Sequence, residues 1–197
     1  MKRFYVKDVI TTVILSILLI VAQFIVNMVC MLNYFVSMIL SVGISCFICA
    51  PVYVLLVHRV AKRMVSLLYM TLLGFVFFIM GDWFLLPYFF IVGVLCELIL
   101  WKEGSSQKYG KITAAWSLYS VLYTGVNLLP LWFFWDDFKK NVLASGMRQD
   151  YMESYMNYYT NVFWVLAATL INLSCALAGC FLAKTLMKKH FAKAEIV

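Results

Sequence analysis

Long apolar runs separated by short polar stretches dominate the chain. Residues 9–57 contain no Asp, Glu, Lys or Arg. As a single helix this run would extend roughly 73 Å, at about 1.5 Å per residue, whereas the hydrocarbon core of a bilayer is about 30 Å thick. We therefore expect two spans with a turn near Met31–Asn33. Four further apolar runs follow, at 64–81, 83–101, 112–135 and 154–183. The pattern predicts an all-α membrane protein with six transmembrane helices.

Composition supports lipid as the solvent of this chain. Of its 197 residues, 65% are hydrophobic and only 13% are charged. A soluble domain has roughly 45–50% apolar and about 25% charged residues. We see no separate soluble domain, repeat or low-complexity tract. Residues 1–197 are thus expected to form a single transmembrane domain in contact with membrane lipid.

The basic residues predict the orientation of the helices. Six spans put both termini on one side, and Lys and Arg gather on the cytoplasmic side of membrane proteins. The predicted topology places 13 of the 16 basic residues on the side of the termini. These are Lys2, Arg3, Lys7, Arg59, Lys62, Arg63, Lys102, Lys108, Lys111, Lys184, Lys188, Lys189 and Lys193. The net charge of +7 is therefore a topology signal that requires no nucleic acid.

Cysteine and histidine give little sign of catalysis or metal binding. The six cysteines lie within or at the ends of predicted spans, and Cys46 and Cys49 form a C-x-x-C pair without a second pair beside it. Free cysteine packs as a small hydrophobe. His58 and His190 lie among the basic residues. We expect no cofactor and no metal site, and the lack of a Ser-His or Glu-His constellation argues against an enzyme.

Several polar residues lie where the chain is otherwise apolar. A charged residue at the centre of a span raises the free energy of membrane insertion by roughly 2.5–3.5 kcal/mol, so each such residue needs a structural or functional explanation. Asp82 is expected either to cap helix four or to face a pocket. Glu97 is expected to pair with Lys102 or Lys111. Asn127 and Asn161 lie in the outer halves of their helices and are candidates to face an outward cavity.

The longest loop, residues 136–160, falls on the outer side. The acid-to-base pair Asp136 and Lys140 is spaced i, i+4 and favours a short helix. After Gly146 a second helical stretch carries several tyrosines, which we expect to face the membrane interface. Loops this long in compact folds are usually functional. The pattern favours a capped site that opens outward.

Helix one offers a candidate docking face. Thr12 and Ser16 are spaced i, i+4, and small residues at this spacing allow another helix to approach closely. The helix has its charges only at the predicted cytoplasmic end. A smooth helix of this kind can slide along lipid or along a protein partner.

The chain resembles the substrate-binding S-components of energy-coupling factor (ECF) transporters, and within them the group called Trep_Strep. The resemblance covers essentially the full chain. It rests on the six-helix length, the "KDVITTVILS" start, "GDW" after helix three, "LLPLWFF" at the end of helix five and the closing "KKHFAKAEIV". Two departures stand out. Helix one of S-components often carries an Ala-x-x-x-Ala pair where this chain has Thr12 and Ser16. Relatives often read Gly-His-Gly-Trp where this chain has "MGDW", so Asp82 is the candidate functional residue of this segment.

The resemblance implies a function and partners. An S-component of the bacterial plasma membrane captures a vitamin or other micronutrient from outside. It then topples against a membrane coupling subunit that sits on two cytoplasmic ATPases. No phosphate-binding G-x-x-x-x-G-K-[ST] motif occurs in this chain, so ATP hydrolysis belongs to the partners. Thr12 and Ser16 would dock the coupling subunit. The connections Cys30–Phe35, Gly81–Leu86 and Asp136–Thr160 would gate the pocket.

Aromatic residues at the outer side could line such a pocket or form an interfacial belt, which Trp and Tyr form in most membrane proteins. A pocket wall of this kind would suit a flat, partly apolar ligand such as a cyclic vitamin or a tetrapyrrole. Asp82 and Asp136 would suit a cationic or donor-rich edge. The candidate wall consists of Trp83, Phe84, Tyr88, Trp132, Trp135, Tyr151, Tyr155 and Trp164. A non-transport membrane scaffold and a membrane-embedded enzyme are the alternative functions.

Overall fold

The computed structural model describes residues 5–191, without the side chains of His190 and Phe191. Lys2, Arg3 and Lys193 therefore lie outside the described residues. The described part is helical and contains no strand. Its α-helices are α1 (Val6–Cys30), α2 (Ser41–Val60), α3 (Val65–Ile79), α4 (Leu85–Leu100), α5 (Tyr109–Tyr123), α6 (Gly125–Phe133), α7 (Trp135–Ala144), α8 (Gln149–Tyr159) and α9 (Val162–Leu186). Three short helices of other types complete it, at Val36–Leu40 (η1), Ser105–Gln107 (η2) and Met187–Phe191 (η3).

Three segments are long and apolar enough to cross a bilayer: Val6–Cys30, Val36–Val60 and Val162–Lys189. The first two flank the turn predicted at Met31–Asn33, which is confirmed, since α1 ends at Cys30. A fourth candidate is the pair Tyr109–Phe133 and Trp135–Ala144, which is bent by 107°. The all-helical membrane class is thus confirmed, with three to four candidate spans among the described residues. Helices α3 and α4 are apolar but shorter, at 15 and 16 residues.

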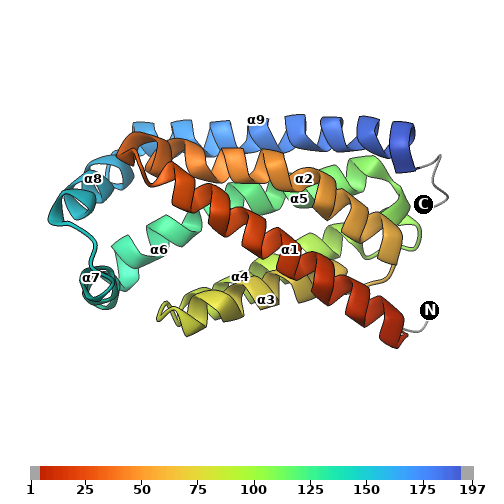
Figure 1. Ribbon diagram of the computed structural model, residues 1–197, viewed down its shortest axis with the longest axis horizontal. Helices are drawn as coiled ribbons and strands as arrows, with labels where there is room; N and C mark the ends of the chain where they lie inside the picture. Colours follow the sequence, from red (N-terminus) through yellow and green to blue (C-terminus); the bar gives the residue numbers. More distant parts are fainter. Residues whose placement is uncertain (1–4, 192–197) are drawn as a thin grey trace.

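The helices run between two ends of an elongated bundle (Figure 1). The start of α1 and the end of α9 lie at one end, with the α2–α3 and α4–α5 connections. These segments carry most of the basic residues, so we name this the basic end. Helices α7 and α8 lie at the opposite, distal end. Helix α2 packs along α9, and α3 packs along α4.

A hydrogen-bonded aromatic group, here the core network, fills the interior. It consists of Gln23, Tyr53, Tyr69, Trp116 and Tyr119, all with 0–2% exposure. The Gln23 amide donates to the Tyr119 hydroxyl at 2.9 Å, and the Tyr69 hydroxyl donates to the Gln23 carbonyl at 3.1 Å. Trp116 stacks on Tyr53 and on Tyr119, with centroids 4.4 and 4.8 Å apart. The network joins α1, α2, α3 and α5.

Glu97 has a different role from the predicted ion pair with Lys102 or Lys111. Its carboxylate accepts hydrogen bonds from the backbone N–H groups of Met64 at 2.6 Å and Ser66 at 3.2 Å. These groups begin α3, where the first N–H groups of a helix lack partners within the helix. Glu97 therefore caps α3 from α4. A carboxylate there also complements the positive end of the helix dipole.

The expected docking face of α1 points into the bundle. Thr12 and Ser16 are both 0% exposed, and the Thr12 hydroxyl donates to the Asp8 carbonyl at 2.8 Å. Their small side chains therefore let α1 pack closely within this chain and present no surface to a partner in this structure. The outward face of α1 carries larger aliphatic residues, among them Ile10, Ile14 and Ile17.

Candidate functional site

Aromatic side chains from several elements meet at the distal end. We name this group the distal cluster. Its members are Asp82, Trp83 and Phe84 of the α3–α4 turn, Phe134, Trp135, Phe138 and Asn141 at and in α7, and Tyr151 and Tyr155 of α8. Phe134 stacks on Phe84 with centroids 4.6 Å apart and contacts Trp83 edge-on at 5.2 Å. The turn after α3 and the segment after α6 are thereby joined.

The sharp turn between α6 and α7 puts α7 over this region. Pro130 lies inside α6, and the helix ends at Phe133. Phe134 then donates its N–H to the Pro130 carbonyl at 3.1 Å, and the chain turns by 107°. Proline lacks the backbone N–H that would continue the ladder. The two short helices expected in residues 136–160 are confirmed as α7 and α8.

Asp82 is the one member of the distal cluster with an acidic side chain. It does not cap helix four, because α4 has Phe84 at its N-cap and no side-chain cap bond. Its carboxylate receives a hydrogen bond from the side chain of Asn141. The same amide donates to the Gly81 carbonyl at 2.9 Å. The second carboxylate oxygen, Oδ1, is shielded from solvent and has no hydrogen-bond partner. Burial raises the pKa of this carboxyl above its usual value of 3.8.

Helix α8 turns its tyrosines toward the bundle. Tyr155 is 1% exposed and packs on Phe138 at 4.9 Å and on Trp135 at 6.2 Å. Its hydroxyl donates to the Asn127 carbonyl in α6. The Tyr159 hydroxyl donates to the Met38 carbonyl in η1 at 2.7 Å. The tyrosine face of α8 thus covers protein, which differs from the expected contact with the membrane interface.

A neighbouring aromatic group joins the first connection to α9. Trp164 contacts Phe35 at 5.8 Å and Tyr158 at 5.5 Å. Tyr34 contacts Tyr151 at 6.1 Å. The connections after α1, after α3 and after α6 therefore meet at one end of the molecule.

Four of the candidate site residues lie elsewhere. Trp132 is 65% exposed and has no ring contact among the described residues, which fits the interfacial belt better than the pocket. Asp136 is exposed on α7. Asn161 is exposed and caps α9 by accepting the Phe163 N–H at 3.0 Å. The Tyr88 hydroxyl donates to the Leu122 carbonyl and so fixes α4 to α5.

Asn127 lies near the point where the apolar run 112–135 is divided into α5 and α6. Thr124 separates α5 from α6, and its hydroxyl accepts from the Asn172 amide at 3.3 Å and from the Thr169 hydroxyl at 3.4 Å. The Asn172 side-chain oxygen is buried and has no partner. The Asn127 N–H bonds the Thr124 carbonyl and the Asn127 carbonyl accepts from Tyr155, so Asn127 links this polar segment to the distal cluster.

Sequence reasoning missed Phe134, Phe138 and Asn141. Phe134 and Phe138 belong to the aromatic "FFWDDF" stretch, but nothing in the stretch distinguishes a bridging ring from a lipid-facing one. Asn141 lies 60 residues from Gly81 in sequence. Only the 107° turn brings it over the α3–α4 connection.

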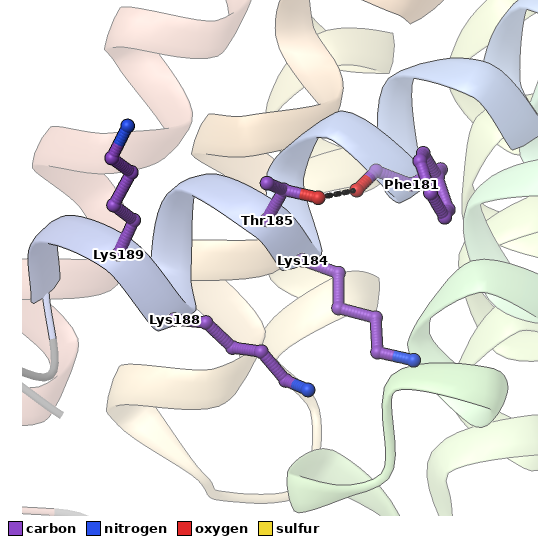
Figure 2. A pocket seen from close by; sticks show the side chains of 5 residues that line it. All are labelled: Phe181, Lys184, Thr185, Lys188 and Lys189. Carbon is purple, nitrogen blue, oxygen red and sulfur yellow. Dashed lines mark hydrogen bonds between the residues drawn. The ribbon is translucent and has the colours of Figure 1, made fainter.

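A shallow groove of about 410 Å³ lies at the basic end (Figure 2). It is lined by Phe181, Lys184, Thr185, Lys188 and Lys189, which all belong to α9 and η3. In Figure 2 the Lys184 and Lys188 side chains extend in a similar direction, and Lys189 points in a different one. The three ammonium groups do not converge on a common point, and this suits a basic surface beside lipid headgroups better than a ligand site.

The described side chains give no sign of metal chemistry. Among residues 5–191, no three His, Cys, Asp or Glu side chains lie close enough together to hold a metal ion. The six cysteines are free. The distal cluster offers instead flat aromatic surfaces and one carboxylate, which can bind a ligand by stacking and charge.

Comparison with known proteins places the chain in a family. The family model described as hypothetical bacterial integral membrane protein (Trep_Strep) matches residues 6–193, and the chain belongs to this family. No curated protein matches the chain, and no solved structure matches it. The chain is therefore an integral membrane protein whose family description names no activity.

Proposed function

We propose that this Trep_Strep family member is the substrate-binding S-component of an ECF-type importer in the bacterial plasma membrane. In this role it captures a vitamin or other micronutrient at the distal end and delivers it inward. The chain itself has no catalytic activity, and two cytoplasmic ATPases act through a coupling subunit. The observation that carries the proposal is the meeting of three connections at the distal cluster. A capture site that opens and closes needs segments of this kind on one side of the membrane.

The proposal includes six passes through the membrane. Helices α1, η1 with α2, α3, α4, α5 with α6, and α9 all run between the two ends of the bundle (Figure 1). At about 1.5 Å per residue, α3 and α4 extend roughly 22–24 Å, short of a bilayer core of about 30 Å. Local thinning of the bilayer accommodates such short helices at modest cost. The basic end then lies in the cytoplasm by the positive-inside rule.

Docking of the coupling subunit moves to the outward face of α1 under this proposal. Thr12 and Ser16 are buried, but Ile14 is 60% exposed and Ile10 and Ile17 are 53% exposed. This face has no charge that would need to be removed from water or paired when a second membrane protein slides along it. Helix α9 carries a comparable residue, Leu170, which is 63% exposed.

Co-purification tests the proposal. The tagged chain is expressed with the coupling subunit and both ATPases of its host, and the complex is isolated in detergent. We expect all three partners to be recovered with the wild-type chain. Ile14→Trp is expected to reduce their recovery, because the larger ring blocks close approach. Leu170→Trp is the matched control and is expected to leave recovery unchanged.

Failure of the wild-type chain to recover the coupling subunit would overturn the proposal. Equal recovery with both variants would place the docking face elsewhere. Mass spectrometry of small molecules extracted from the wild-type chain would identify the nutrient, and a lipid-only extract would count against capture of a soluble ligand.

A further inference from the structure

The environment of Asp82 is unusual for a carboxylate. Gly81 has a φ of +106°, a conformation that favours glycine, and it turns the chain directly before Asp82. The Asn141 side chain holds this turn by bonding the Gly81 carbonyl and the Asp82 carboxylate. Oδ1 of Asp82 nevertheless has no partner and no solvent access. A shielded carboxylate oxygen without a hydrogen bond costs free energy, so such a group is a candidate for a binding role.

Two tyrosines of α8, Tyr151 and Tyr155, are close enough to this carboxylate to respond to its charge. Burial raises the pKa of Tyr151 to about 12, and the nearby charge of Asp82 contributes to the shift. The same charge raises the pKa of Tyr155, after the larger effect of burial. The two rings lie 6.2 Å apart, and Tyr155 continues to Phe138 at 4.9 Å. The negative faces of such rings attract cations.

No ion pair with a basic side chain balances Asp82 in the part of the chain that the structure describes. The ion pairs seen in residues 5–191 join Lys62 to Asp8 and Arg148 to Asp150, and neither involves Asp82. A metal ion would need several ligating side chains, and no such group is present in the described chain. An organic cation needs fewer ligating groups than a metal ion, because one carboxylate and the faces of aromatic rings are enough to bind it.

We propose that the distal cluster binds a ligand carrying an organic cation, with Asp82 as its counter-ion and the Tyr151 and Tyr155 rings as its walls. This deepens the proposed function, because it names the ligand class that the same site would take. The cation supplies the partner that Oδ1 lacks. The ring faces then allow a delocalised or alkylated cation to bind without further hydrogen bonds.

Access to Asp82 involves α7. Asn141 of α7 bonds the Gly81 carbonyl, and Trp83 Nε1 donates to the Asp137 carboxylate at 3.5 Å. Helices α7 and α8 are joined at Gly146, which has a φ of +79°. In the proposed binding step, separation of α7 from the α3–α4 turn would break these two bonds and give a ligand access to the carboxylate.

The test uses choline as the cationic probe and 3,3-dimethylbutan-1-ol as its uncharged counterpart of the same shape. Each is titrated into the full chain in detergent at pH 7, with calorimetry as the readout. We expect the wild-type chain to bind choline about tenfold more tightly than the alcohol, or better, which is the scale of a desolvated cation–π and carboxylate contact. Asp82→Asn is expected to abolish this preference.

Two variants keep the result interpretable. Asp136→Asn removes an exposed acid from the same end and is expected to leave the preference unchanged. Tyr151→Leu removes one ring and is expected to weaken choline binding several-fold with the charge intact. Equal binding of both probes by the wild-type chain, or an undiminished preference in Asp82→Asn, would overturn the inference. Assembly with the coupling subunit does not depend on either outcome, so the proposed function is judged separately.

Discussion

The core network and the distal cluster are both built mainly from aromatic residues, but they differ in how completely their polar groups are hydrogen-bonded. In the core network the Gln23 amide, the Tyr69 hydroxyl and the Tyr119 hydroxyl satisfy one another at 2.9–3.3 Å. In the distal cluster Asp82 keeps one oxygen without a partner. The network is fully buried, whereas Trp83 of the cluster is 49% exposed. Aromatic content alone therefore does not distinguish the two regions, whereas the state of the acidic group in the distal cluster does.

The largest expected effect is on the core network. Trp116→Ala is expected to destabilise the fold by about 3–5 kcal/mol, because it removes a fully buried ring and leaves a cavity between Tyr53 and Tyr119. Denaturant unfolding in detergent, followed by circular dichroism, measures the loss. Trp132→Ala is the control at an exposed position. Similar losses in the two variants would contradict the assignment of Trp116 to the core.

A smaller loss is expected where the network keeps its shape but loses a partner. Gln23→Leu leaves the Tyr69 and Tyr119 hydroxyls to bond only each other, at 3.2 Å. We expect a cost of about 1–2 kcal/mol, the scale of hydrogen bonds lost inside proteins and membranes. The same unfolding assay applies. A neutral or stabilising outcome would show that the network contributes no net stability.

Removing the polar group of the distal cluster is expected to stabilise the fold, whereas the substitutions in the core network destabilise it. The pKa of Asp82 is raised above 3.8 in the folded chain, chiefly by burial. A carboxyl with a raised folded pKa makes the fold less stable once it ionises, so stability falls as the pH rises from 3.8 through the folded pKa. Asp82→Asn removes this cost. We expect the variant to melt higher than wild type at pH 7 in the absence of ligand.

The melting temperatures of wild type and Asp82→Asn should converge below pH 3.8. Asp136→Asn serves as the control, because that carboxylate is exposed. A lower melting temperature for Asp82→Asn at pH 7 would give Asp82 a structural role and would remove the contrast between the two regions.

The smallest effect is expected at Trp132. Its side chain is 65% exposed and makes no ring contact among the described residues. Trp132→Phe is expected to change stability by less than about 0.5 kcal/mol, as exposed substitutions usually do. Thermal unfolding measures this, and choline titration gives a second readout. A clear loss of probe binding would bring Trp132 back into the site.

The apolar runs by themselves determined the helical membrane class and the turn after Cys30, and the spacing of charges and tyrosines in residues 136–160 indicated α7 and α8. These features depend on local composition and on the length of each run, both of which are visible in one dimension. The Gly81–Asp82 turn is equally local, since glycine accepts the positive φ found there.

Tertiary structure alone decided which side of each helix faces protein. In a membrane helix the lipid-facing and core-facing residues are both apolar, so the hydrophobic pattern carries no direction. Thr12 and Ser16 therefore proved to be buried, and Trp132 proved to be exposed. Glu97 accepts hydrogen bonds from backbone N–H groups that lie more than 30 residues away in the sequence. The setting of Asp82 arises in the same way, because the 107° turn after α6 brings Asn141 to the Gly81 carbonyl, and no ion pair with Asp82 forms among the described residues.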